Sequence, residues 1–304
     1  MFRVAGLGEV LWDCFEGGRR PGGAPANAAF QTNQLGAKGI VFSRVGADSL
    51  GEELVSFLAS QNLEVSCVQK DPHHPTGTVS ARLSPDGTAE YTIHESVAWD
   101  FLLLDNAWRS TLATLDAICF GTLAQRSAVS CRAIRETLKM VPDRTLKVFD
   151  VNLRQDYYSR AILEESLRLA HVVKLNEDEV EVVSRLLDLP GTSLEAFGEG
   201  CAEKFDLRKV CITRGAEGCL LLEKNATRTL SVAVPGEPAC VVDTIGCGDA
   251  FSAAFIYAEL SATDLDTQAR FSNAVGTLVA TQSGGMPILV EELSGLKRRL
   301  GFAS

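Results

Sequence analysis

The sequence predicts an α/β fold built on a doubly wound, mostly parallel sheet flanked by helices. Short apolar runs rich in β-branched residues alternate along most of the chain with longer segments of helical periodicity, the pattern of a parallel sheet covered by helices. The chain has 304 residues, of which 46% are apolar, so it can bury the core of one large domain. No Pro/Gly/Ser-rich linker or internal repeat divides it, and we expect a single domain over residues 1–304.

The expected strands and helices follow one another in an order that right-handed crossovers can connect. An apolar run from Val4 to Val10 predicts the first strand, and Ala24 to Leu35 predicts a helix that ends at Gly36, a residue typical of helix C-termini. Further strands are expected at residues 39–45, 116–120, 146–151, 171–175, 209–213, 219–223, 229–234 and 239–243, and further helices at residues 49–61 and 128–140.

The stretch from Gly77 to Ile93 departs from this rhythm because apolar and polar residues alternate in it. A strong turn signal, Ser84-Pro85-Asp86-Gly87, lies between its two arms, so we expect an antiparallel hairpin. A hairpin near the carboxyl ends of parallel strands could cover a substrate and exclude water. An edge hairpin without such a role fits the pattern equally well.

Composition and charge exclude several classes of protein. The 29 Lys and Arg against 39 Asp and Glu give a net charge of −10, and such a surface repels nucleic acid. No apolar stretch is long enough to span a membrane and no leader pattern opens the sequence, so we expect a cytoplasmic protein without membrane contact. The nine cysteines form no Cys-x-x-Cys pair, which indicates reduced core residues and neither a disulfide framework nor a zinc site.

An anion cradle and a carboxylate are combined in the segment Asp243-Thr244-Ile245-Gly246-Cys247-Gly248-Asp249. Gly246 and Gly248 let neighbouring amides turn toward one point, and a helix that starts here adds unpaired amides and its dipole. A phosphoryl group could lie against residues 246–248, and Asp249 could accept a proton from a hydroxyl that attacks the phosphorus. Taken alone, the motif is better explained by an Asp that caps a helix after a Gly-rich turn.

Residues suited to binding a polyol lie near two other strand ends. Asp13 follows the first strand, and Gly22 and Gly23 precede the helix that carries Asn27, so a small polyol could approach the backbone and exchange hydrogen bonds. Arg154, which follows the strand at residues 146–151, could meet a hydroxyl or a phosphate. A loop that closes onto a helix and a capped strand-end turn explain the same residues without any ligand.

Two further strand ends carry residues suited to a metal ion and a nucleotide. Asn176 and Glu179 stand three apart, on one face of a helix, and their oxygens suit Mg²⁺ bound through its water shell. An Asn–Glu capping arrangement is at least as good an explanation. After Thr213, a turn shaped by Gly215 and Gly218 offers backbone against which a nucleotide could lie, but it is also an ordinary hairpin turn.

The motifs together resemble those of the ribokinase-like pfkB carbohydrate kinases. DTIGCGDAF is similar to the carboxy-terminal signature of that family, and GGAPANAAFQTNQLGA is similar to its amino-terminal one. The resemblance runs from Gly8 to Gly285, and GEVLWD, PGGAPAN and DVNLR look most like fructokinases. It implies a ribokinase-like fold with a small β lid formed by segments at about 11–20 and 76–101, with ATP and Mg²⁺ as cofactors and K⁺ as a further candidate.

By this resemblance each predicted site residue acquires a role. The catalytic base is Asp249, and the anion hole is formed by Gly246, Cys247 and Gly248. The sugar-binding residues are Asp13, Gly23, Asn27 and Arg154. The nucleotide and its phosphates are handled by Asn176, Thr213, Gly215, Gly218 and Asn273, with Glu179 contacting Mg²⁺ through water. A monovalent cation site comprises Asp243, Ile245 and Gly284.

Two residues depart from the pattern of the family that the chain resembles. Cys247 stands where alanine is commoner, and a thiol at a helix N-terminus can have a lowered pKa, so we hypothesise modest redox inhibition through this residue. Arg214 stands where a neutral residue is commoner, and it could meet a nucleotide phosphate or face solvent.

The expected activity is ATP-dependent phosphorylation of fructose at its primary 6-hydroxyl. Other acceptors, such as 2-keto-3-deoxygluconate, ribose or a nucleoside, remain alternatives within the same enzyme class. A non-catalytic sugar or nucleotide sensor on the same fold is the alternative from a different class. The expected partners are a small-molecule sugar and ATP, with a homodimer through the lid as a further expectation.

Overall fold

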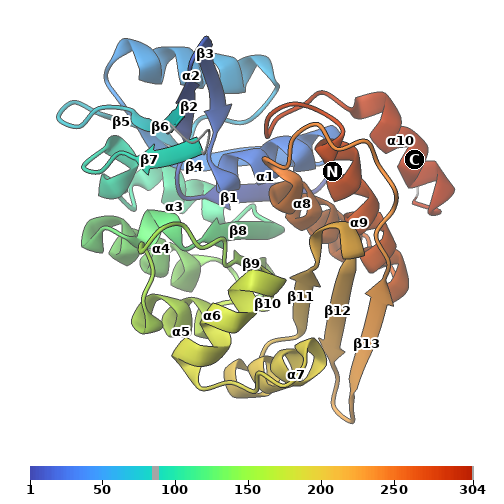
Figure 1. Cartoon of the computed structure of the whole chain (residues 1–304). Coiled ribbons are helices and arrows are strands. Elements are labelled where there is room, and N and C mark those ends of the chain that lie inside the picture. The colour runs from blue at the N-terminus through green and yellow to red at the C-terminus, as the bar shows by residue number, and fades with distance from the viewer. Residues whose placement is uncertain (84–88, 303–304) are drawn as a thin grey trace.

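The computed structural model describes residues 1–83 and 89–302 and places one large sheet at the centre of the chain (Figure 1). Within the described residues this main sheet has nine strands in the order β13-β12-β11-β10-β9-β8-β1-β4-β5. Their bounds are β1 Arg3–Leu7, β4 Lys38–Gly46, β5 Val68–Asp71, β8 Ala117–Gly121, β9 Leu146–Asp150, β10 Val172–Asn176, β11 Lys209–Thr213, β12 Cys219–Lys224 and β13 Thr229–Val234. All pairs from β11 to β5 are parallel, and β12 is antiparallel to both of its neighbours. The predicted doubly wound, mostly parallel sheet is confirmed.

Helices cover both faces of the main sheet. Helices α3 to α7 pack against one face, whereas α1, α8, α9 and α10 pack against the other (Figure 1). The bounds are α1 Ala24–Gln34, α2 Ser49–Ser60, α3 Asn106–Leu112, α4 Ala128–Met140, α5 Arg160–Leu169, α6 Glu177–Leu187, α7 Leu194–Phe205, α8 Cys247–Leu260, α9 Leu265–Ala280 and α10 Val290–Arg299, with short 3₁₀ turns η1 Ala98–Phe101, η2 Leu123–Gln125 and η3 Gly215–Glu217. Because successive strands are joined through helices, their carboxyl ends lie along one edge of the sheet.

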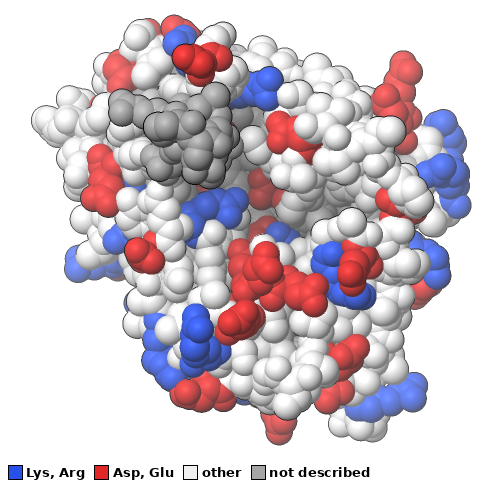
Figure 2. Space-filling model, viewed as in Figure 1, with Lys and Arg blue, Asp and Glu red and all other residues white. Residues whose placement is uncertain are grey.

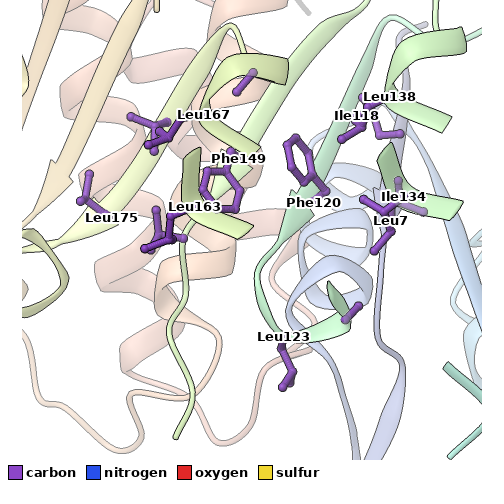
Figure 3. Close-up of a cluster of buried hydrophobic side chains, with 14 of the residues drawn as sticks. Leu7, Ile118, Phe120, Leu123, Ile134, Leu138, Phe149, Leu163, Leu167 and Leu175 are labelled. Atoms are coloured by element: carbon purple, nitrogen blue, oxygen red, sulfur yellow. The ribbon is translucent and has the colours of Figure 1, made fainter. Parts of the chain in front are cut away.

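The side chains of each central strand point alternately toward the two helical layers, as a period of two requires. On β8, Ile118 and Phe120 belong to the apolar cluster that includes α4 and α5 (Figure 3), whereas Ala117 and Cys119 belong to the cluster that includes α8 and α9. Complete burial of one large apolar side chain contributes about 2 kcal/mol. The strands therefore fix the two helical layers on opposite faces of the sheet.

The cysteines are all unpaired, as the sequence predicts. Five of the nine are buried, but Cys240 is exposed, so its expected place in the core is wrong. Within the described residues no cluster of three His, Cys, Asp or Glu side chains could hold a metal ion. In the same part of the chain, no helix is both long enough and apolar enough to cross a membrane.

A separate four-stranded sheet, here called the small sheet, lies beside the main one. It consists of β3 Gly18–Gly22, β2 Leu11–Phe15, β6 Gly77–Leu83 and β7 Ala89–Ile93, in that order. Strands β6 and β7 form the predicted antiparallel hairpin, whose expected turn at residues 84–87 lies outside the described residues. Strand β2 pairs in parallel with β6 and antiparallel with β3.

Two of the expected strands differ from the structure. The predicted strand at residues 4–10 ends at Leu7, since Gly8 adopts a φ of 148° that lies outside the range of a strand, and Asp13 lies on β2 of the small sheet. The predicted strand at residues 239–243 is wrong, since this segment has no strand conformation. Pro235 and Pro238 lack backbone donors, and Val241 and Val242 are more than 60% exposed, so neither a ladder nor burial stabilises a strand here.

Candidate active site at the carboxyl edge of the sheet

The predicted anion cradle is the first turn of α8. Gly246 has a φ of 79° and precedes the helix, and a methyl group on it would lie 2.5 Å from Gly285 Cα, so only glycine fits. A methyl group on Gly248 would lie 2.8 Å from Lys174 Nζ. Within the described residues no side chain caps the N-terminus of α8. The first turn thus combines a close backbone approach with amides and a helix dipole that favour an anion.

Asp249 is a buried carboxylate on this turn, with 9% of its surface exposed. Its Oδ2 accepts a hydrogen bond of 2.7 Å from Asn27 Nδ2, so the structure joins two predicted site residues that are far apart in the sequence. Burial, together with the negative charge of Asp150, raises the pKa of Asp249 to about 6, while the Asn27 bond and the charges of Lys174 and Arg154 oppose the rise. A carboxylate with this pKa is ionised at neutral pH and is a better proton acceptor than an ordinary aspartate.

Glu9 is a second buried carboxyl in the site, and sequence analysis gave it no role. It lies shortly after the end of β1, with 3% of its surface exposed, and its Oε1 accepts a 3.2 Å hydrogen bond from Ala24 N at the start of α1. Its Oε2 has no hydrogen-bond partner among the residues that the structure describes. Burial and the charge of Asp249 raise the pKa of Glu9 to about 7. A charged residue directly after an apolar buried strand was the signal that could have found it.

The predicted sugar-binding residues converge on the same region. Asp13 reaches it from β2, and burial raises its pKa to about 6, although the charge of Arg154 lowers it. Arg154 is also close enough to Asp249 and Glu9 to lower their pKa values. Gly23 has a φ of 107°, and a methyl group there would lie 2.4 Å from Glu9 O. The structure therefore brings the small sheet, α1 and the loop after β9 around Asp249.

The Asn–Glu pair forms a capping box at the start of α6. Asn176 Oδ1 accepts from Glu179 N at 2.8 Å, and Glu179 Oε2 accepts from Asn176 N at 2.9 Å. Glu179 Oε1 accepts from Leu153 N at 2.7 Å, which ties α6 to the loop that carries Arg154. Burial raises the pKa of Glu179. The capping explanation is confirmed, and these engaged oxygens fit Mg²⁺ only through its water shell.

The predicted nucleotide residues gather at the end of β11. Thr213 ends this strand, and Gly215 and Gly218 adopt positive φ values of 53° and 94° in the following turn. A methyl group on Gly218 would lie 2.0 Å from Val234 O, so the turn packs directly on the end of β13. Asn273 of α9 donates from Nδ2 to Pro235 O at 3.2 Å.

Arg214, in the same turn, forms an ion pair with Glu217 at 2.6 Å. The sequence left open whether this arginine meets a nucleotide phosphate or faces solvent. In the structure its charge is paired with the neighbouring surface residue Glu217. An exposed pair of this kind contributes about 0–1 kcal/mol.

Asp243 joins the two loops that flank the cradle. Its Oδ1 accepts from Ile245 N at 3.0 Å and its Oδ2 accepts from Gly284 N at 2.9 Å. Arg20 of the small sheet reaches the same carboxylate, with Nη1 3.7 Å from Oδ2. The predicted cation residues are thus adjacent, and a charged contact connects them to the small sheet.

The expected lowering of the Cys247 pKa is wrong. Burial, reinforced by the negative charges of Asp249 and Asp243, raises the pKa of the Cys247 thiol to about 11. These effects exceed the attraction of the helix N-terminus for a thiolate. The hypothesis of redox inhibition through Cys247 loses its physical basis.

Figure 2 shows a hollow between the part of the molecule that carries the small sheet and the part below it in this view. Acidic side chains gather along the lower border of the hollow. The first turn of a helix suited to an anion, a buried carboxylate that is ionised at neutral pH and polar residues from three sides form an arrangement that is compatible with phosphoryl transfer.

Comparison with known proteins agrees with this class of site. Residues 4–292 match the family model described as pfkB family carbohydrate kinase, and the chain belongs to this family. A Pyrococcus horikoshii protein described as an uncharacterized sugar kinase is 31% identical over 301 residues, covering 93% of this chain and 91% of that protein. A fructokinase of Salmonella typhimurium is 29% identical over 284 residues, covering 88% of each chain.

Solved structures of the same family superpose over nearly the whole chain. The P. horikoshii sugar kinase in complex with ATP has a TM-score of 0.78 at 26% identity and covers 97% of this chain and 100% of that one. A Vibrio cholerae fructokinase double mutant with fructose, ADP and potassium ion bound has a TM-score of 0.79 at 26% identity and covers 97% of this chain and 98% of that one. The ribokinase-like fold and the carbohydrate-kinase class follow from these matches.

Proposed function

We propose that the chain is an ATP-dependent sugar kinase that transfers the γ-phosphoryl group to a primary hydroxyl of a free monosaccharide, with fructose as acceptor and fructose 6-phosphate as product. The observation that carries the proposal is the buried Asp249 carboxylate on the first turn of α8, hydrogen-bonded by Asn27. Fructose is favoured because the relatives named fructokinase, at 26–29% identity, match most of the chain.

In the proposed reaction, Asp249 accepts the proton of the acceptor hydroxyl, and the oxygen of that hydroxyl attacks the γ-phosphorus in line. The bond between the γ-phosphorus and the bridging oxygen breaks, and ADP leaves with that oxygen. Amides at Gly246, Cys247 and Gly248 and the dipole of α8 stabilise the negative charge that the phosphoryl oxygens carry. Mg²⁺ held through water by Asn176 and Glu179 would supply further positive charge to the nucleotide phosphates. With a pKa of about 6, Asp249 is ionised at neutral pH and can take this proton without prior activation.

The acceptor is proposed to lie among Asp13, Gly23, Asn27 and Arg154, with the small sheet acting as a lid that excludes water. Asp13 and Asn27 can accept and donate hydrogen bonds to sugar hydroxyls. An acidic sugar such as 2-keto-3-deoxygluconate would need a cation over its carboxylate, and Arg154 is the candidate. Ribose and nucleosides remain alternatives because the site polarity suits any polyol.

The nucleotide is proposed to lie along the turn after β11, where Thr213, Gly215, Gly218 and Asn273 come together. Asn176 and Glu179 would act on its phosphates and on Mg²⁺ through water, beyond their capping role. Asp243, Ile245 and Gly284 are the proposed surroundings of a monovalent cation. Comparing turnover in potassium, sodium and choline chloride at equal ionic strength tests that site, since equal rates in all three salts would contradict it.

A coupled ADP-release assay over free sugars, sugar acids and nucleosides tests the function. Fructose is expected to give the highest kcat/KM, and NMR of the product is expected to show phosphate on the 6-hydroxyl. Faster turnover of a sugar acid or a nucleoside would refute fructose specificity. Binding of sugar and ATP without ADP release from any acceptor would refute catalysis and support a sensor.

A homodimer through the lid is a further part of the proposal. Strand β3 is an edge of the small sheet, and Gly18, Arg19 and Arg20 on it are exposed. An exposed edge can pair with a second copy. Light scattering of the purified protein tests this, since a monomer at micromolar concentration would contradict it.

A further inference from the structure

A buried ion pair lies directly beneath the cradle. Lys174 on β10 and Asp150 on β9 are partners in the parallel ladder, and Lys174 Nζ lies 3.1 Å and 3.3 Å from the two carboxylate oxygens. Only 6% of Lys174 and 4% of Asp150 is exposed. Ser252 of α8 donates from Oγ to Asp150 Oδ2 at 2.7 Å. The pair therefore connects two central strands to the helix that carries the cradle.

The ammonium group of Lys174 also packs against the cradle itself. A methyl group on Gly248 would lie 2.8 Å from Lys174 Nζ, so the ammonium lies next to this glycine. Ser252 stands one helical turn after Gly248, on the same face of α8. The ion pair therefore meets the first two turns of α8, because the ammonium lies beside Gly248 and Asp150 accepts the hydroxyl bond of Ser252.

Lys174 is the buried cation among several buried acids. Although burial alone lowers its pKa, the charges of Asp150, Glu179 and Asp249 raise it, so Lys174 stays charged. Its charge also lowers the pKa values of the thiols of Cys119 on β8 and Cys211 on β11, although burial raises both overall.

Asp249 faces charges on four elements of the fold. Asp150 of β9 and Glu9 after β1 are acidic, whereas Lys174 of β10 and Arg154 in the loop after β9 are basic. Removal of Lys174 would leave the charge of Asp150 uncompensated beside Asp249. An unpaired buried charge of this kind favours protonation of a neighbouring carboxylate.

We propose that Lys174 is a positioning residue for phosphoryl transfer: paired with Asp150, it holds Gly248 and Asp249 in place and cancels the negative charge beneath them. This inference rests on the proposed function of the same site. The neutral, similarly long variant Lys174→Met is the direct test. We expect kcat to fall at least tenfold, KM for sugar and ATP to stay within about threefold, and the midpoint of the acid limb of the pH–rate profile to rise by about one pH unit.

The second variant, Lys174→Met with Asp150→Asn, removes both charges and leaves no uncompensated one. We expect its acid midpoint to return to within about half a pH unit of the wild-type value, because the charge that disturbs Asp249 is gone. This double variant also keeps the test open if Lys174→Met alone does not fold.

Lys209 offers a matched control outside the site. It is equally buried, with 5% exposed, and its Nζ pairs with Glu259 at 2.5 Å and with Glu223 at 3.0 Å, at the amino end of β11. Lys209→Met is expected to lower stability and to leave the pH–rate profile unchanged. If it moves the acid midpoint as far as Lys174→Met does, the inference is wrong.

Two other results would overturn the inference. One is a Lys174→Met variant with wild-type kcat and midpoint. The other is a variant with an unchanged midpoint but a KM for ATP raised more than tenfold, which would make Lys174 a direct phosphate ligand.

A readout without turnover separates this inference from the proposed function. Asp249→Asn is introduced into the wild type and into Lys174→Met, and the unfolding free energy of each protein is measured with and without this substitution. Within each pair only the Asp249 carboxyl differs, so the pH dependence of the difference in unfolding free energy reports the pKa of Asp249. We expect the midpoint of this difference to rise in the Lys174→Met background even if no sugar is phosphorylated, and an unchanged midpoint refutes the inference.

Discussion

Replacement of Asp249 by asparagine removes the proposed base and keeps the shape of the site. The asparagine carbonyl oxygen can still accept the hydrogen bond that Asn27 Nδ2 donates at 2.7 Å to the wild-type carboxylate. General-base catalysis contributes about 100-fold or more, so we expect kcat to fall by at least about 100-fold while sugar and ATP still bind.

The pH dependence of the wild-type enzyme follows from the raised pKa. With a pKa of about 6, Asp249 is the protonated, inactive acid below this value and the ionised base above it. We therefore expect kcat/KM to rise with pH, reach a plateau above pH 7 and fall to about one-tenth of the plateau at pH 5. An ordinary aspartate would keep the plateau down to about pH 5.

The same shift predicts a stability difference of known sign. Since burial raises the pKa of Asp249 from 3.8 to about 6, the folded state favours the protonated form, and this contribution to stability is complete below pH 3.8 and is lost as the pH rises through 6. A shift of about two pH units corresponds to at most about 3 kcal/mol. We expect Asp249→Asn to equal the wild type in unfolding free energy near pH 4 and to exceed it at pH 8.

The coupled ADP-release assay and urea unfolding at several pH values measure these effects. Asp178→Asn is a matched control, because Asp178 is exposed on α6, which packs on the opposite face of the main sheet from α8. It should change neither the turnover nor the pH dependence of the unfolding free energy. Turnover of Asp249→Asn within tenfold of the wild type, or an acid limb without a midpoint near pH 6, would refute the assignment of Asp249 as the base.

Three other changes test neighbouring parts of the site. Iodoacetamide is expected to label the exposed Cys240 before Cys247, because burial raises the pKa of the Cys247 thiol to about 11. Mass spectrometry measures the order of labelling, and labelling of Cys247 first would contradict this expectation. Arg20→Ala should lower kcat/KM for the sugar about tenfold, because it removes the charged contact between the small sheet and the loop before α8. Arg19→Ala on the same strand is the control, and equal effects of the two substitutions would argue against a specific contact of Arg20. Glu179→Gln keeps a capping acceptor but loses the charge, so the Mg²⁺ concentration for half-maximal rate should rise severalfold, and an unchanged value would exclude the metal role.

Most of the fold could be predicted because strand and helix patterns are local. The hairpin arms Gly77–Leu83 and Ala89–Ile93 and the strand Lys209–Thr213 are present where periodicity predicts them. The failure at residues 239–243 has a tertiary cause, since an apolar run becomes a strand only when a neighbour accepts its hydrogen bonds.

The site could be predicted only in part. Asn27 and Asp249 were identified by motif, and the structure joins them by a hydrogen bond across 222 residues of sequence. Glu9 stands in the segment GEVLWD and Lys174 in the predicted strand at residues 171–175, but the sequence gave neither a role, because the function of a charged side chain depends on burial and on its neighbours. Cys247 shows the same limit, since its helix position suggested a lowered pKa and its surroundings raise it.

The sequence by itself determined the order of strands and helices, the glycine positions of the cradle and the class of protein. The reason is that backbone preference and hydrophobic period act over neighbouring residues. Only the tertiary structure decided which charges meet beneath the cradle and which carboxyl groups have a raised pKa. It also decided that Lys174 is the lysine whose charge offsets that of the buried carboxylates. Burial and Coulomb energy depend on distances in space, and those distances join β1, β9, β10, α1 and α8 from distant parts of the chain.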